Sequence, residues 1–196
     1  MFTKFSKQFH SIGQKIALPY IVFFELVLIC RMVSVYSTLP PKIDSIFSMI
    51  IMLLSGIIFL SHFLPMILEK KKIKIEYWLI VFTVILAIST LLNREYAFTE
   101  NIKLIIWQCI FFFCVFEVGR ENNKKLFTVF ETILLVVWSA LVLFSLYLFF
   151  ARVSFSTPVK SLYYGMRIGF FENRLYGIFV DPNYPTTISL VCIIFA

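Results

Sequence analysis

Residues 127–150 read FTVFETILLVVWSALVLFSLYLFF, and this segment decides the class of fold. Glu131 is the one charged side chain within it. A helix needs about 20 consecutive apolar residues to cross a hydrocarbon core that is roughly 30 Å thick. Residues 127–150 therefore predict a helix that spans a membrane, and the lipid bilayer is the first partner expected for this chain.

Four further apolar runs precede this one, and together the five predict an all-α, polytopic transmembrane helix bundle. The chain is 60% hydrophobic, whereas a soluble domain is usually nearer half apolar and has shorter apolar runs. Residues 16–150 are expected to hold the five spans, at 16–36, 43–68, 77–92, 102–118 and 127–150.

A shorter apolar run, residues 186–196, ends the sequence. As a helix it would rise roughly 16 Å, about half of a membrane. We interpret it as the start of a sixth span in a longer protein, of which this chain is the N-terminal portion. The alternative is a re-entrant half-helix.

Basic side chains alternate between successive loops. The tail at residues 1–15 and the loops after the second and fourth predicted spans are rich in Lys and Arg, whereas the other two loops hold Lys42 and Arg94. This is the positive-inside pattern, which predicts a cytoplasmic N-terminus and an exported segment at 151–185. The pattern accounts for most of the net charge of +7, so no nucleic-acid partner is expected.

The tail itself allows two interpretations. Its apolar residues have helix-like spacing, which favours an amphipathic helix at the membrane interface. A frayed basic tail is the alternative. The four cysteines all lie within apolar runs and no Cys/His zinc spacing occurs, so they are interpreted as packing residues and no metal is expected.

The exported segment is basic although it lies on the side that the positive-inside rule leaves poor in charge. Its basic side chains are Arg152, Lys160, Arg167 and Arg174. It ends in RLYGIFVDPNYP, residues 174–185, where Arg, Gly, Asp, Pro and Asn gather between two apolar runs. A basic segment in this position favours an anionic ligand outside the membrane.

Particular residues of this segment suit such a ligand. The guanidinium groups of Arg167 and Arg174 can each donate two hydrogen bonds to phosphate oxygens. Gly177 allows the main chain to approach another group closely or to adopt a positive φ. Asn183 is predicted to cap a helix that starts near Pro185, and the positive end of that helix would attract a phosphate.

The pattern Arg174-x-x-Gly177-x4-Pro182-Asn183 resembles the motif of the O-antigen ligase and polysaccharide polymerase family, which are bacterial membrane glycosyltransferases. The resemblance covers residues 170–190 by motif and the whole chain by hydropathy. It implies that Arg174 is catalytic and contacts the pyrophosphate of an undecaprenyl-linked glycan. A sugar hydroxyl would attack the anomeric carbon and the lipid pyrophosphate would leave, without a metal or another cofactor.

The implied function is to polymerise or ligate oligosaccharide repeat units for capsule, exopolysaccharide or O-antigen, at the outer face of the bacterial cytoplasmic membrane. Other polysaccharide export proteins are possible partners. The family carries a second exported loop with further Arg and often His, which this sequence lacks, so this portion alone is expected to be inactive. The residues assigned to substrate binding are Arg31, Arg167, Tyr176, Gly177, Asp181, Pro182 and Asn183.

Two charged residues fall inside the first predicted span. Arg31 follows Glu25 by six residues, about 9 Å along a helix and about 120° around it, so the two should not pair. Because a buried ionisable group is costly in a membrane, Glu25 is either a catalytic acceptor-side base that lines a cavity or a structural group bonded to another span. Arg31 is expected to reach the outer interface and join the anion site.

Two other classes of function remain open. A transporter or flippase of polysaccharide export would need charged residues along several spans, and Glu25 and Arg31 are the only strong candidates. A non-enzymatic scaffold or an inactive remnant would explain the missing second loop. Flux of lipid-linked sugar into vesicles without chain growth would support the transporter, and retained function of a chain with residues 167–185 scrambled would favour the scaffold.

Overall fold

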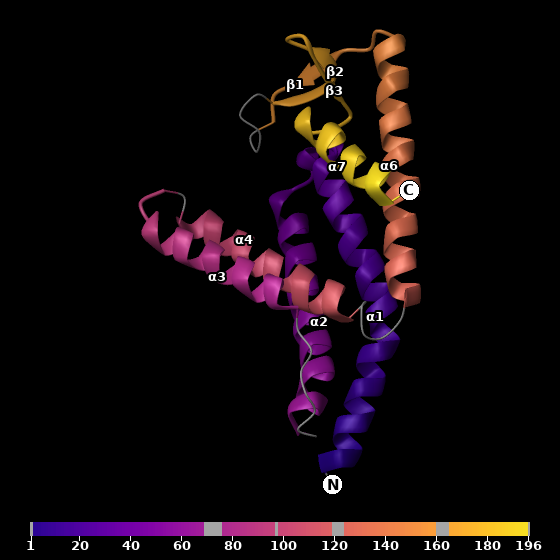
Figure 1. Ribbon diagram of the computed structural model, residues 1–196. Helices are drawn as coiled ribbons and strands as arrows, with labels where there is room; N and C mark the ends of the chain where they lie inside the picture. Colours follow the sequence, from indigo (N-terminus) through magenta and orange to yellow (C-terminus); the bar gives the residue numbers. More distant parts are fainter. Residues whose placement is uncertain (1, 69–75, 97, 119–123, 160–164, 196) are drawn as a thin grey trace. The chain divides into compact units, whose positions relative to one another are not determined.

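The computed structural model describes residues 2–68, 76–96, 98–118, 124–159 and 165–195 (Figure 1). The chain divides into two compact units. The first comprises Met1–Ile21 and Ile50–Phe127, and the second comprises Val22–Met49 and Thr128–Ala196. Lys160 and the basic loop residues at 69–75 and 119–123 lie outside the described residues.

The described chain is mostly helical, as the apolar runs predict. The helices are α1 (Phe2–Met32), α2 (Pro41–Leu68), α3 (Tyr77–Leu92), α4 (Phe98–Ile110), α6 (Lys124–Phe150) and α7 (Asn183–Phe195), with a 3-10 helix η1 (Ser34–Thr38) and a π-helical turn η2 (Phe111–Phe116). Four stretches of the described residues are long and apolar enough to cross a membrane: His10–Met32, Pro41–Leu68, Phe98–Phe116, which combines α4 and η2, and Leu126–Phe150. The chain is therefore a multi-pass membrane protein that is mostly helical.

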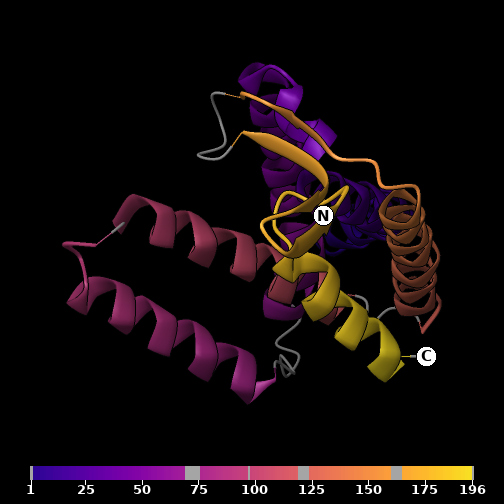
Figure 2. The same ribbon diagram turned by 90° about the horizontal axis from the view of Figure 1, so that it is seen from above.

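The third predicted span is the weakest of the five. It forms α3, which has 16 residues and would rise about 24 Å, less than the hydrocarbon thickness. Helix α3 packs beside α4 as an antiparallel pair (Figures 1 and 2). The tail at residues 2–15 is helical and continues directly into the first span as part of α1.

In the first unit, a buried group of polar side chains joins three helices. The hydroxyl groups of Tyr20 on α1 and Ser55 on α2 lie 2.6 Å apart, and the Cys114 thiol of η2 donates to the main-chain oxygen of Ser55 at 3.4 Å. Cys114 is buried and free, in agreement with its interpretation as a packing residue.

Residues 151–185, which are predicted to be exported, contain a sheet that the all-α prediction did not include. Three antiparallel strands lie in the order β1 (Phe155–Thr157), β2 (Met166–Phe171) and β3 (Arg174–Gly177). Glu172 and Asn173 connect β2 to β3, and both have a positive φ, at 49° and 58°. Two successive residues with positive φ make the tight hairpin turn that matches the natural twist of antiparallel strands.

The second unit is built around α6. Its core comprises Trp138, Leu148, Ile178, Phe179 and Cys192. The ring of Trp138 on α6 lies 4.9 Å from the ring of Phe179, and its indole nitrogen donates to Ser189 of α7 at 3.1 Å. Helix α7 starts beside the sheet and runs obliquely toward α6 (Figure 1). The segment after β3 is thereby fixed on two helices.

Helix α6 ends in a left-handed cap. The main-chain nitrogen of Val153 donates to the oxygen of Leu148, and that of Arg152 donates to the oxygen of Phe149. This is the Schellman arrangement, in which glycine usually occupies the left-handed position. Here Arg152 occupies it with a φ of 54°, so the arginine is held at some conformational cost.

Replacing Arg152 with glycine should therefore stabilise the protein relative to Arg152→Ala. Alanine retains the cost of the left-handed conformation, whereas glycine removes it, and we expect a difference of about 1 kcal/mol. Thermal unfolding of both variants in detergent would measure it. Equal melting temperatures would contradict the left-handed conformation of residue 152.

Candidate functional site

The segment after β3 is attached to the end of α1 by main-chain hydrogen bonds. The nitrogen of Ser34 donates to the oxygen of Ile178 at 2.7 Å, and the nitrogen of Val180 donates to the oxygen of Met32 at 2.9 Å. Val33 and Phe179 form an isolated antiparallel bridge between these bonds. The second bond satisfies one of the carbonyl groups that the end of a helix leaves unpaired.

Gly177 lies at the point where this segment meets α6. It is buried, its φ is +58°, and an added Cβ would overlap the Cβ and the hydroxyl oxygen of Ser145. The Ser145 hydroxyl accepts a hydrogen bond from the nitrogen of Ile178 at 3.2 Å and donates to Leu141 of α6 at 2.9 Å. The sequence predicts that Gly177 allows either a close approach or a positive φ, and the structure has both.

Arg167 is held on one face of the hairpin. Its guanidinium group lies 3.0 Å from the Glu172 carboxylate and donates to the Tyr176 hydroxyl at 3.3 Å. It also lies 5.8 Å from the ring centre of Phe171 and 5.6 Å from that of Tyr176, within cation–π range. The hydrogen bond to the Glu172 carboxylate raises the pKa of Arg167, so the guanidinium group stays charged. Its contacts with Glu172 and Tyr176 hold it in place.

Arg174 differs from Arg167 in its exposure. It is the first residue of β3, pairs with Phe171 across the hairpin and is exposed. Because Arg167 already contacts Glu172, its charge is partly offset before any ligand arrives. Arg174 is thus the motif residue that is best placed to meet an anion from solution.

Arg31 lies in the last turn of α1 and forms an ion pair that the sequence pattern did not predict, while its role in an anion site stays a prediction. Its Nε donates to Asp44 Oδ1 at 2.8 Å, and its Nη2 donates to the Ser48 hydroxyl at 2.6 Å. The Tyr36 hydroxyl donates to the same Asp44 oxygen at 2.8 Å. Asp44 stands in the first turn of α2, where a carboxylate is favoured by the helix dipole.

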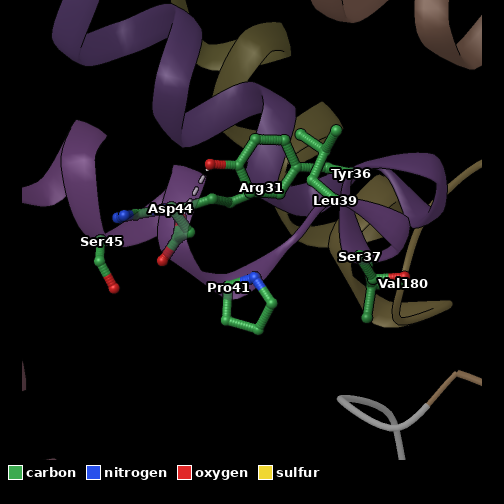
Figure 3. A pocket seen from close by; sticks show the side chains of 8 residues that line it. All are labelled: Arg31, Tyr36, Ser37, Leu39, Pro41, Asp44, Ser45 and Val180. Atoms are coloured by element: carbon green, nitrogen blue, oxygen red, sulfur yellow. Dashed lines mark hydrogen bonds and ion pairs between the residues drawn. The ribbon is translucent and has the colours of Figure 1, made fainter.

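These side chains border a surface cavity of about 380 Å³ (Figure 3). Figure 3 shows the Tyr36 hydroxyl directed toward Asp44, and Val180 labelled beside Ser37, away from Asp44 and Ser45. Val180 immediately precedes Asp181 and Pro182 of the motif. The cavity thus joins the α1–α2 connection to the motif, and its lining is Arg31, Tyr36, Ser37, Leu39, Pro41, Asp44, Ser45 and Val180.

The start of α7 differs from the prediction. The helix begins at Asn183, not near Pro185. The carboxylate of Asp181 accepts a hydrogen bond from the main-chain nitrogen of Asn183 at 2.8 Å. The capping role predicted for Asn183 therefore belongs to Asp181, because Asn183 already lies within the first turn. Pro182 stands between them.

Glu25 does not line the cavity bordered by Arg31 and Asp44. It is 2% exposed and lies beside the main chain of Leu134 on α6, yet neither carboxylate oxygen meets hydrogen-bond geometry with a described residue. A catalytic base must come within hydrogen-bond distance of its substrate, and a ligand in that cavity would contact its lining residues, which do not include Glu25. Its assignment as an acceptor-side base stays a prediction.

A second cavity, of about 410 Å³, lies at the end of α6. It is lined by Phe149, Phe150, Arg152, Ser154 and Phe170. The rings of Phe149 and Phe170 meet edge to face at 5.7 Å. A cation beside exposed aromatic rings is typical of the boundary between a membrane and water.

No family model matches the chain, and no curated protein or solved structure matches it either. The resemblance to the ligase and polymerase family therefore rests on residues 170–190 and on the hydropathy of the chain.

Proposed function

We propose that this protein is a membrane glycosyltransferase that extends or transfers a glycan carried on undecaprenyl pyrophosphate at the outer face of the bacterial cytoplasmic membrane. One observation carries the proposal: residues 178–180 are bonded through their main chain to residues 32–34 and to the Ser145 hydroxyl of α6, and Arg174 of the adjoining strand is exposed. An exposed arginine on a main chain that is held in position suits a site that stabilises charge on a leaving group, because such donors must be preorganised.

The contacts of the second unit support the topology on which this proposal depends. Residues 33–34 and 178–180 bond directly to one another, so both lie on the same side of the membrane. An even number of crossings must therefore separate them. Helices α2 and α6 supply two. Helices α3 and α4, which pack as an antiparallel pair, add two more if both cross and none if neither does, whereas a crossing by α4 alone would not satisfy the condition. Five spans before the exported segment satisfy this condition.

The proposed reaction is a single displacement at the anomeric carbon. The acceptor hydroxyl oxygen forms a bond to that carbon, and the bond from the carbon to the pyrophosphate oxygen breaks. The electron pair leaves with the lipid pyrophosphate, whose charge Arg174 stabilises, and the hydroxyl proton passes to a base or to water. Tyr176 and neighbouring aromatic rings would pack against sugar faces.

Deleting the gene should abolish long surface polysaccharide while single lipid-linked repeat units still reach the outer face. Gel analysis of polymer length and a membrane-impermeant probe of sugar in spheroplasts would measure both. Repeat units retained on the inner face would favour the flippase alternative. Normal polymer in the deletion strain would favour a scaffold or remnant and would overturn the proposal.

A further inference from the structure

The cavity bordered by Arg31, Tyr36, Asp44 and Ser45 has the chemistry of a site for hydroxyl groups. Three hydroxyl-bearing side chains line it together with one carboxylate and one guanidinium group. A carboxylate accepts several hydrogen bonds and a hydroxyl both donates and accepts them, and each hydroxyl of a sugar can likewise donate and accept. A volume of about 380 Å³ also falls within the range of small-ligand sites.

The charges of this cavity argue against a phosphate as its ligand. Arg31 is paired with Asp44 at 2.8 Å, so the positive charge is already neutralised. A phosphate would have to displace the carboxylate or lie beside it. A neutral ligand meets neither cost, and the Asp44 side chain is still 43% exposed and able to accept a hydrogen bond.

Tyr36 and Arg31 hold the carboxylate in place. Both donate to Oδ1 of Asp44 at 2.8 Å. Burial raises the pKa of Tyr36, and the neighbouring Asp44 adds to that effect, so the phenol stays protonated and remains a donor at neutral pH. Two donors on one oxygen fix the carboxylate before a ligand arrives, which lowers the cost of binding.

We propose that this cavity is the acceptor subsite, in which Asp44 and Ser45 bind hydroxyl groups of the sugar that attacks the donor. This proposal rests on the proposed function, since an acceptor subsite has a meaning only in a glycosyltransferase. The cavity is next to the motif, because Val180 lines the cavity and is followed directly by Asp181 and Pro182. Asp44 is a binding residue that selects and orients the acceptor.

Binding of lipid-free oligosaccharide to the full-length protein in nanodiscs tests the subsite directly. The probe is the set of oligosaccharides that mild acid releases from the surface polysaccharide of the same cells, and saturation-transfer NMR reports the affinity. Asp44→Asn should weaken binding about tenfold or more, because a hydrogen bond to a charged group is lost. Ser45→Ala should weaken it about threefold, at the low end for a neutral hydrogen bond.

Matched variants separate the possible results. Glu100→Gln removes another carboxylate from the first turn of a helix, one that is paired with Lys103 at 2.8 Å, and should leave binding unchanged. Ser45 is exposed, so Ser45→Ala tests the subsite even if Asp44→Asn fails to fold. Binding that is unchanged in folded Ser45→Ala and Asp44→Asn, or absent in the wild type, overturns the subsite.

The same measurements distinguish failure of the subsite from failure of the proposed function. Arg174→Ala should bind lipid-free oligosaccharide normally, because the probe carries no phosphate. If binding depends on Asp44 while Arg174→Ala makes normal polymer, the subsite stands and the donor-site assignment falls. If Arg174→Ala abolishes polymer and Asp44→Asn leaves oligosaccharide binding unchanged, the donor-site assignment stands and the subsite falls.

Discussion

Gly177→Ala is expected to destabilise the second unit by about 3 kcal/mol or more. Two costs add: an L-residue with a φ of +58° is strained, and the new Cβ overlaps Ser145 on α6. Relief of that overlap would move the hairpin away from α6 and break the bond from Ile178 to the Ser145 hydroxyl. Thermal unfolding in detergent, followed by size-exclusion chromatography and tryptophan fluorescence, would measure the loss.

Gly56→Ala is the matched control for this variant. Gly56 lies within α2, and an added Cβ there has no atom within 4 Å among the described residues. Alanine is also the better helix former by about 1 kcal/mol, so this variant should be as stable as the wild type or more so. If the two variants melt at the same temperature, the close approach of Gly177 to Ser145 is wrong.

The sequence predicts the helices well because each apolar run carries its own signal. Residues 77–92 were expected as a span and form a helix with those bounds, and residues 127–150 end where α6 ends. The first run was predicted to continue to Tyr36, but α1 stops at Met32. There the chain pairs with residues 178–180, and such a distant partner leaves no local pattern.

The sheet and the ion pair were missed for related reasons. The strands are short, and the hairpin depends on Glu172 with a positive φ, a conformation that glutamate seldom adopts. The pairing of Arg31 with Asp44 crosses the turn between two helices, so helical spacing could not reveal it. In contrast, a single glycine between apolar residues was enough to predict the conformation of Gly177.

Arg174→Ala is expected to lower the rate of polymer formation by about 100-fold without loss of the folded protein. Removal of one donor that stabilises charge developing in a transition state costs about two to three orders of magnitude in rate. Arg174 is exposed, and a surface substitution of this kind usually changes stability by less than about 0.5 kcal/mol. The variant should be made in the full-length gene and assayed for polymer yield and for protein in the membrane.

Two further arginine variants serve as controls for Arg174→Ala. Arg94→Ala removes another exposed arginine, from the turn between α3 and α4, and should leave polymer yield unchanged. Arg174→Lys retains the charge but loses the planar fork that binds two phosphate oxygens at once, so its rate should fall between those of wild type and Arg174→Ala. Normal polymer from Arg174→Ala would remove this residue from the site.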